Sequence, residues 1–433
     1  MSSEPAQPET PGIRVLLSDP NYFRIWLMGG LIGVVRWLHL LVLGIYTFEI
    51  TDSPLLVSIV PVLFMLPLAV CGPLVGVIAD RFPRKRILWV STAAIMLVSI
   101  VTAVVSVLGE LQFGHVAVVA LLNGVFWTTD MPVRRRMMGD LSRGALSAAM
   151  SLDSATGNVT RMFGPLLGGV MLQTFSISGV FVLSSAIFAV CLVLIITTQL
   201  PGPQEAGVRR AFFRELVTGI GFVSRDRRLR RVFAVTIIFN IWGFPFTSMV
   251  PVLGKERLGL DPFYVGLLSS MEGLGAFIGA LMVAMLARPS NFYRIYTGGT
   301  LVYLVMIGYL SILSFVAGGP THSYIAATVA LVVIGCSGAC FAAMQSTLTY
   351  LGAPPELRSR VLGVLTLCIG TGPIGFFNVG WMAELYGVSV ALLIISAEGL
   401  FVLLALWAYG AAVDFSAAAV TSRRTAPSTN AGD

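Results

Sequence analysis

The chain contains few charged residues: Asp, Glu, Lys and Arg make up only 11% of its 433 residues, whereas soluble domains average roughly 25%. Apolar residues account for 56%. A soluble fold with this composition would lack the polar surface that keeps a globular protein in solution. The composition therefore excludes an ordinary soluble protein and indicates a membrane protein.

Cysteine and histidine are scarce too, with five and three residues. All five cysteines lie in apolar stretches, so we expect no disulfide framework. Cys336 and Cys340 are one helical turn apart, but no histidine or carboxylate accompanies them, and we expect no metal site. No nucleotide-binding loop is present either, so we expect no cofactor and no direct coupling to ATP.

Twelve apolar runs are present, and each has about the length that crosses a ~30 Å hydrocarbon core as a helix. They cover residues 25–48, 55–79, 87–108, 116–133, 146–173, 179–200, 232–253, 263–286, 295–316, 324–347, 361–386 and 388–409. We therefore expect an all-α membrane protein with 12 transmembrane helices. The expected divisions are a polar tail (1–21) without signal-peptide features, a six-helix half (22–200), a linker (201–231), a second six-helix half (232–409) and a tail (410–433).

Basic residues indicate the orientation of these helices. With both termini in the cytoplasm, 24 of the 28 Lys and Arg residues fall in inner segments, as the positive-inside rule requires. Clusters such as Arg134–Arg136 are then topology signals, and no nucleic-acid partner is expected. We expect an integral multi-pass protein of the cytoplasmic (inner) membrane, surrounded by lipid bilayer.

The linker and an internal repeat support the division into halves. Phe212, Phe213, Leu216 and Ile220 recur at helical spacing among charges in the linker, which predicts an amphipathic helix along the inner membrane surface. One offset of 208 residues relates the pair Ser53-Pro54 to Asp261-Pro262, and Gly164-Pro165 to Gly372-Pro373. Two pairs on the same offset indicate a duplicated six-helix unit.

The loop between the second and third runs reads GVIADRFPRKR, from Gly76 to Arg86. Its spacing, GxxxDRxxRKR, resembles the loop between helices 2 and 3 of the major facilitator superfamily, although Pro83 stands where that family usually has glycine. The GPLLGG segment (164–169) and PPELRSRVLG (354–363) are similar to the branch that contains enterobactin exporters and drug-efflux relatives. One departure is Arg36, because many relatives carry a different polar or an acidic residue in the middle of the first helix.

This resemblance implies a monomeric secondary transporter that alternates between inward- and outward-open states, with helices 1, 4, 7 and 10 around the substrate cavity. It also implies a gating motif composed of Gly76, Asp80, Arg81, Arg84, Lys85, Arg86 and Asp130. Asp80 can dock at the positive amino end of the eleventh helix, and Asp130 can pair with Arg81 or Arg84. The alternative is that the basic residues only set topology and that Asp130 is solvated.

Ionisable residues inside the apolar runs are the other candidates, because a charge at the bilayer centre costs roughly 2.5–3.5 kcal/mol and therefore faces a cavity or a partner. The expected substrate or proton pathway contains Arg36, His39, Asp153, Arg161 and Glu272, together with the polar or aromatic Asn240, Trp242 and Gln345. A purely structural ionic network, and ordinary packing for Trp242, remain as alternatives. The family geometry favours Arg36 as a cavity residue and disfavours Glu398.

A pair between Arg161 and Glu272 would be a suitable proton-coupling site, because a carboxylate and an arginine at similar depth can separate when the protein changes state. Gly275 and Gly279, like the glycines of GPLLGG, indicate close helix packing rather than ligand contact. A permanent structural bridge between Arg161 and Glu272 is the alternative.

Two function classes follow. The first is a proton-coupled exporter of a small amphipathic molecule, either siderophore or drug-like, that acts as an antiporter. The second is a membrane-embedded enzyme or receptor without transport. We expect no enzyme, because the sequence contains no paired nucleophile and base and no suitable His–Asp constellation.

The substitution Asp80→Asn tests the gating motif. It removes the anion but keeps the basic topology signal, so we expect normal membrane insertion and slowed transport. Flux is measured in proteoliposomes at matched protein content. Unchanged flux would remove the docking role of Asp80.

Overall fold

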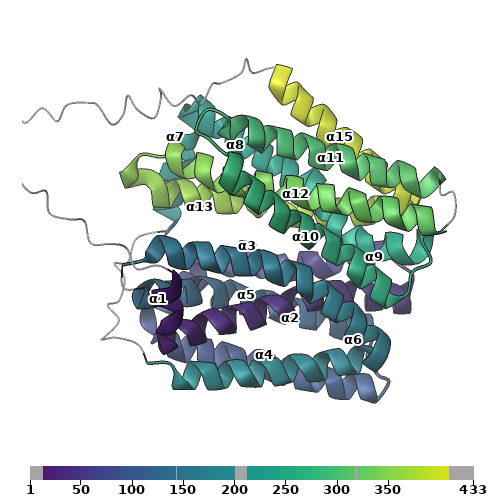
Figure 1. Ribbon diagram of the computed structural model, residues 1–433, viewed down its shortest axis with the longest axis horizontal. Coiled ribbons are helices and arrows are strands. Elements are labelled where there is room, and N and C mark those ends of the chain that lie inside the picture. The colour runs from purple at the N-terminus through teal and green to yellow at the C-terminus, as the bar shows by residue number, and fades with distance from the viewer. Residues whose placement is uncertain (1–12, 143, 200–211, 317–319, 409–433) are drawn as a thin grey trace, which may run out of the picture. The chain divides into compact units, whose positions relative to one another are not determined.

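The computed structural model describes residues 13–142, 144–199, 212–316 and 320–408, except for the side chains of residues 69, 71–81, 212–214, 316, 320 and 321. Every regular element in these ranges is a helix (Figure 1). The elements are α1 (Ile13–Ser18), α2 (Pro20–Thr51), α3 (Pro54–Arg81), α4 (Arg84–Val107), α5 (Phe113–Leu141), α6 (Leu146–Thr197), α7 (Phe212–Arg225), α8 (Arg227–Ile238), η1 (Phe239–Gly243), η2 (Phe244–Met249), α9 (Val250–Val252), η3 (Leu253–Arg257), α10 (Pro262–Leu286), α11 (Phe292–Val316), α12 (Pro320–Gly352), η4 (Pro355–Leu357), α13 (Arg358–Ile369), α14 (Gly372–Tyr386) and α15 (Val388–Ala408).

The predicted all-α membrane fold is confirmed. Among the described residues, 10 helical segments are long and apolar enough to cross a membrane. One of them, α6, has 52 residues and holds both the fifth and the sixth predicted runs, with a sharp bend at Ser176 (φ 57°, ψ −174°). The number of 12 spans stays a prediction, because the described apolar part of α3 reaches only from Pro54 to Leu68.

Two helical segments differ in extent from the apolar runs of the sequence. The fourth run was expected to end at residue 133, yet α5 continues to Leu141, so Arg134–Arg136 lie within a helix rather than in a loop. The eleventh run, 361–386, lies within one candidate span, Pro355–Tyr386, in which α13 ends at Ile369 and α14 begins at Gly372. Side chains that pair or pack along these helices extend or divide them in ways that hydropathy alone does not reveal.

The seventh predicted run is an irregular helix. After α8 the backbone widens into the π-helical turn η1 and then tightens into the 3₁₀ segment η2. Pro245 accounts for this irregularity. Its ring lacks an N–H and, in a regular α-helix, would collide with the carbonyl of Ile241 four residues earlier. A Cβ added at Gly375 of α14 would overlap that same carbonyl oxygen. The glycine therefore lets α14 approach the irregular turn.

The chain forms two compact units. Unit 1 comprises the described parts of Met1–Asp52, Leu63–Arg209 and Asp261–Ser270, and unit 2 comprises those of Ser53–Val62, Arg210–Leu260 and Met271–Asp433. The first turns of α3 thus belong to unit 2, and the first turns of α10 belong to unit 1. The division into two contiguous six-helix halves at the linker stays a prediction.

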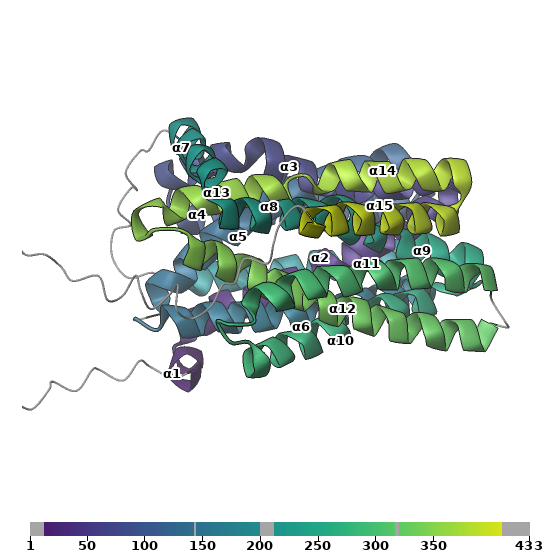
Figure 2. The ribbon, with the colours of Figure 1, turned by 90° about the horizontal axis from the view of Figure 1, so that it is seen from above.

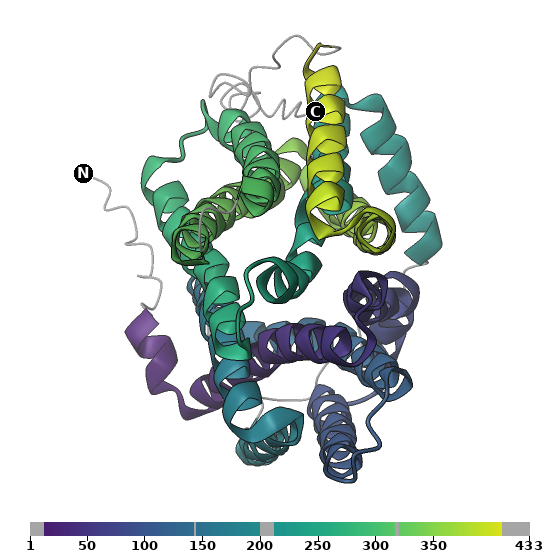
Figure 3. The same ribbon diagram turned by 90° about the vertical axis from the view of Figure 1, so that its right-hand side faces the viewer.

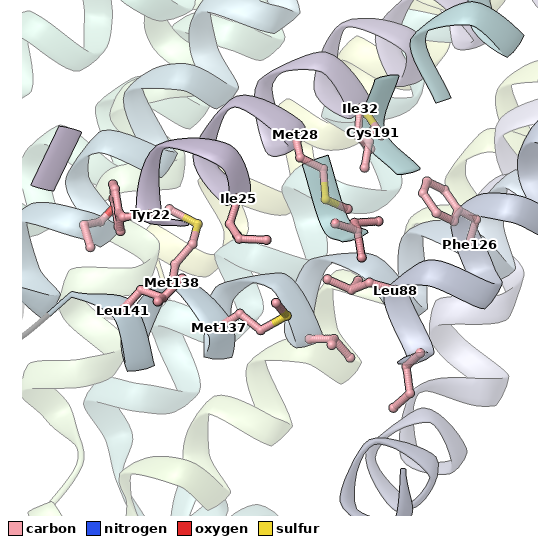
Figure 4. Close-up of a cluster of buried hydrophobic side chains, with 14 of the residues drawn as sticks. Tyr22, Ile25, Met28, Ile32, Leu88, Phe126, Met137, Met138, Leu141 and Cys191 are labelled. Atoms are coloured by element: carbon pink, nitrogen blue, oxygen red, sulfur yellow. The ribbon is translucent and has the colours of Figure 1, made fainter. Parts of the chain in front are cut away.

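Unit 1 is built around α2, which packs against α5 and α6. The helix starts at Pro20, and Asp19 caps it by accepting hydrogen bonds from the N–H groups of Asn21 (2.9 Å) and Tyr22 (3.4 Å). Figure 4 shows Tyr22 and Ile25 of α2 in a buried cluster with methionines of α5. Helical spacing of apolar residues on α2 therefore produces the core of this unit.

Glycines bring the helices of unit 1 into close contact. A Cβ at Gly164 would lie 2.6 Å from Cβ of Trp37, and one at Gly169 would lie 2.6 Å from the carbonyl oxygen of Pro262. Gln173 of α6 also accepts a hydrogen bond from the backbone N–H of Phe263 (3.0 Å). The prediction that GPLLGG serves helix packing is confirmed.

In unit 2, α11 packs against α12 and α15, and α15 packs against α14. Figures 2 and 3 both show α15 beside α14. The backbones of α10 and α12 also approach closely, because Cβ atoms at Gly275 or Gly335 would overlap the backbone carbonyls of Val332 and Glu272. The predicted packing role of Gly275 is confirmed.

A helix, α7, lies within the predicted linker. Its Gly219 faces α13 so closely that a Cβ would lie 2.7 Å from the carbonyl oxygen of Arg360, and Glu215 pairs with the Arg360 guanidinium at 3.8 Å. Val217 and Ile220 are exposed. Their contact with the membrane surface stays a prediction.

The substitution Gly335→Ala tests the α10–α12 contact. The added methyl would push against the backbone of Glu272, which cannot move away as a side chain can, so we expect a loss of about 1–3 kcal/mol in stability. Gly298→Ala in α11 is the matched control, because nothing lies within 4 Å of its Cβ position and alanine favours helix by up to about 1 kcal/mol. Thermal unfolding of the purified protein in detergent measures both. Equal melting of Gly335→Ala and wild type would contradict the close contact.

Candidate functional site

Arg36 lies near the middle of α2 and stacks on aromatic rings. Its Cζ is 3.9 Å from the ring centroid of Trp127 on α5 and 5.0 Å from that of Trp37. No described carboxylate lies within ion-pair distance of Arg36, and its buried Nε has no hydrogen-bond partner among the described residues. Cation–π contact therefore takes the place of an ion pair at this arginine.

The two tryptophans extend this group. Trp37 also lies 5.0 Å from the guanidinium carbon of Arg161 on α6, so its ring is near two cations. Trp127 packs on Phe64 of α3, with 5.7 Å between ring centroids. We call Arg36, Trp37, Trp127 and Arg161 the arginine–tryptophan cluster. Both tryptophans are missing from the sequence prediction, since a tryptophan in an apolar run gives no sign that a cation will face it.

His39 lies one turn further along α2 and joins three helices. Its Nδ1 is 3.2 Å from Oδ1 of Asn123 on α5, and its Nε2 is 2.8 Å from Oγ of Ser184 on α6. The Asn123 amide donates to the carbonyl of Val119, so its oxygen faces the histidine and accepts the Nδ1 proton. Both ring nitrogens are thereby satisfied inside unit 1, and a role of His39 in the proton pathway stays a prediction.

Asp130 and Asp153 form an ionic cluster with two arginines. Arg134 binds Asp130 (3.2 Å) and Asp153 (2.8 Å), and Arg135 binds the other oxygen of Asp153 (2.8 Å). Asp130 is fully buried. A Cβ on Gly29 of α2 would lie 2.8 Å from Cζ of Arg134, so this glycine makes room for the guanidinium.

The ionic cluster corrects two expectations. Asp130 was predicted to pair with Arg81 or Arg84. Among the described residues its partner is Arg134, one turn away on its own helix, and Arg84 pairs with Asp140 instead; the Arg81 side chain lies outside the described residues. Asp153 was predicted at mid-span, but it lies in the second turn of α6, where Arg134 and Arg135 reach it. The extension of α5 past residue 133 is what brings these arginines to the carboxylates.

Two basic residues of the gating motif, Arg84 and Lys85, bind within unit 1. Arg84 forms an ion pair with Asp140 near the end of α5. Lys85 donates to the carbonyls of Ile196 (2.7 Å) and Thr198 (2.8 Å) at the end of α6, which satisfies carbonyls that a helix end leaves free. The side chains of Gly76, Asp80 and Arg81 lie outside the described residues, and the roles of Asp80 and Arg86 stay predictions.

Asn240 and Gln345 belong to one buried polar network in unit 2. Gln345 of α12 donates to Thr236 Oγ1 (3.2 Å), Asn240 donates to the Thr236 carbonyl (2.9 Å), and the Tyr296 hydroxyl of α11 lies 2.8 Å from Thr236 Oγ1. Tyr296 in turn donates to the carbonyl of Val232 (2.8 Å). The sequence suggested Asn240 and Gln345, whereas their partners Thr236 and Tyr296 are ordinary residues in apolar runs and gave no signal.

Trp242 does more than fill space. Its indole N–H donates to Oε2 of Glu398 on α15 at 2.9 Å, so ordinary packing is an incomplete interpretation of this residue. Glu398 was disfavoured on family geometry, yet it is the partner of a predicted pathway residue. Arg161 and Glu272 belong to different compact units, and their pairing stays a prediction.

Comparison with curated proteins identifies similar transporters. The chain is 26% identical over 356 residues to the multidrug efflux pump Tap of Mycolicibacterium fortuitum. This alignment covers 79% of this chain and 84% of Tap. The chain is 19% identical over 358 residues to the staphyloferrin A transporter of Staphylococcus aureus, which covers 82% of this chain and 87% of that protein.

Solved structures agree on the fold. The nucleoside transporter NupG superposes with a TM-score of 0.69 at 15% sequence identity, over 89% of this chain and 98% of NupG. The family model described as Major Facilitator Superfamily matches residues 25–376. With apolar helices of membrane-spanning length throughout, the chain is an integral membrane protein and belongs to the major facilitator superfamily of transporters.

Proposed function

We propose that the protein is a proton-coupled exporter of a small amphipathic molecule that carries an anionic group, working by alternating access. The observation that carries this proposal is Arg36, a cation near the middle of a membrane-spanning helix whose guanidinium rests on Trp127 without a carboxylate partner among the described residues. A cation retained at that depth suits an anionic ligand group.

The arginine–tryptophan cluster also suits the rest of such a ligand. A guanidinium gives charge-assisted hydrogen bonds to a carboxylate or similar oxyanion, and the adjacent indole rings offer apolar surface to an aromatic or aliphatic body. Arg161 near Trp37 adds positive potential. The relative named as a multidrug efflux pump supports the outward direction and a drug-like cargo, and the relative named as a staphyloferrin A transporter supports a siderophore-like cargo.

The proposed transport cycle also needs a coupling ion and a defined orientation in the membrane. Protons are the coupling ion, and the carboxyl groups within the apolar helices are the candidates to carry them, Glu272 among them. Both termini face the cytoplasm, which the distribution of basic residues supports. The alternative of a membrane-embedded enzyme or receptor has less support, because the family and the compared relatives are transporters.

Arg36→Ala tests the anion site. Loss of a charge-assisted contact of about 1.5–3 kcal/mol should weaken transport of a labelled aryl carboxylate roughly 10- to 100-fold in apparent affinity. Its methyl ester lacks the anion and should lose less than about 3-fold. Proteoliposome flux with and without an imposed pH gradient measures both compounds.

Arg14→Ala is the matched control, since it removes one exposed arginine of α1 and should leave both fluxes unchanged. Equal losses for acid and ester in Arg36→Ala would point to a structural arginine. No gradient-driven flux of any tested compound in the wild type would contradict proton coupling.

We also propose that the ionic cluster of Asp130, Arg134, Arg135 and Asp153 holds α5 and α6 together as unit 1 moves. Arg134→Met would leave buried Asp130 without its cation, which should cost about 3–5 kcal/mol in stability. Arg135→Met, whose side chain is 46% exposed, should cost less than about 1 kcal/mol. Thermal unfolding in detergent measures both, and Asp130→Asn should restore stability to Arg134→Met. Failure of that rescue would mean that Arg134 acts through another contact.

A further inference from the structure

Glu398 is the only charged residue of α15 and lies at its centre, ten residues after Val388 and ten before Ala408. Its side chain is partly buried. A carboxylate at the centre of a membrane-spanning helix is costly, so such residues are retained where they have a function or a compensating partner. The contacts of Glu398 therefore decide its role.

Trp242 is the partner, and the contact is built into the backbone around it. The indole N–H donates to Glu398 Oε2 at 2.9 Å. The next residue on α15 is Gly399, and a Cβ there would lie 2.8 Å from Cβ of Trp242. The glycine thus admits the tryptophan to the position from which its N–H reaches the carboxyl group.

No cation among the described residues compensates the charge of Glu398. Among the described residues, none forms an ion pair with Glu398. The elements packed against α15 are α8, η1, α11 and α14, and their charged residues lie toward helix ends. These are Arg227, Arg228, Arg230 and Arg231 on α8, Arg294 on α11 and Glu384 on α14, with none on η1; the other titratable groups of α11 are Tyr293, Tyr296, Tyr303 and Tyr309.

A single neutral donor tolerates both forms of the carboxyl group. The charged form accepts the indole hydrogen bond at Oε2, and the protonated form can still accept it at the carbonyl oxygen while the O–H lies on Oε1. An arginine partner would instead favour only the charged form. Glu398 can therefore gain or lose a proton without losing its contact to Trp242.

The contact between Trp242 and Glu398 lies in the irregular part of the seventh helix, because Trp242 belongs to η1. Trp242 is the fourth residue of the π-helical turn η1, and such turns are frequent at functional sites. At the start of this turn, Phe239 stacks on Phe341 of α12 with 3.7 Å between centroids. A change at Glu398 therefore acts on a turn that contacts α12 and α14 as well as α15.

We propose that Glu398 is a proton-binding site, and that the Trp242 indole ties its protonation to the π-helical turn of the seventh helix. The proposal deepens the proposed function, since it rests on proton coupling and names a carboxyl group that carries the proton. A proton from water binds to one carboxylate oxygen and leaves again to water, with no other reactant.

Infrared difference spectroscopy of the full-length protein in liposomes tests the site without any substrate. The carbonyl stretch of a protonated carboxyl group should appear when the pH is lowered and disappear when it is raised. In Glu398→Gln the share of this signal that corresponds to one carboxyl group should be lost. Glu384→Gln is the matched control, because it removes a carboxylate near the end of α14. The carbonyl band assigned to Glu398 should be unchanged in this variant.

Trp242→Phe distinguishes the proposed contact from a carboxyl group that titrates alone. Phenylalanine keeps a ring but lacks the N–H, so the carbonyl stretch of Glu398 should remain and move to higher frequency as it loses its hydrogen bond. An unmoved band would overturn the role of Trp242. A pH difference spectrum identical in Glu398→Gln and wild type would overturn the site.

Failure of the wider function is separable from failure of the site. Absence of gradient-driven flux in wild-type liposomes, with the Glu398 band still titrating, would refute proton-driven export and leave the site standing. Gradient-driven flux that persists in Glu398→Gln, with no lost band, would refute the site and leave the export proposal standing.

Discussion

The low dielectric of the membrane interior constrains the ionisable side chains that lie within the apolar helices. A charge in that environment needs an opposite charge, a π face or a hydrogen-bond donor. Arg134 meets this need with two aspartates, Arg36 with tryptophan rings, and Glu398 with an indole N–H. The choice of partner separates fixed groups from responsive ones, because an ion pair holds one charge state and a neutral partner does not.

Periodicity and composition predicted much of the fold, because apolar runs and basic loops depend on residues close in sequence. The all-α architecture and the glycine-mediated packing at Gly164 and Gly275 followed from such local signals. The bend at Ser176 and the π-helical turn at Phe239 did not. A serine in a polar gap and a proline four residues after a carbonyl are compatible with several backbone paths, and tertiary packing selects one.

Only about half of the residues of the candidate site could be predicted from the sequence. Arg36, His39, Asp130 and Trp242 stand out because charged, polar or large aromatic residues are rare in apolar runs. Their partners Trp127, Ser184, Arg134 and Glu398 lie on other helices or were assigned other roles. Pairing depends on helix rotation and register, which a hydropathy pattern does not encode. That limit explains why Asp130 was expected to pair with Arg81 or Arg84, whereas Arg134 binds it.

The two compact units exchange short segments: residues 53–62 complete unit 2, and residues 261–270 complete unit 1. This exchange has a consequence for biogenesis. Residues 210–260 are synthesised before the segment 261–270, so Gly169 lacks its contact with Pro262 until that segment has been made. Unit 2, conversely, uses a segment made long before the rest of it. Each unit is therefore completed by a segment that lies within the sequence of the other.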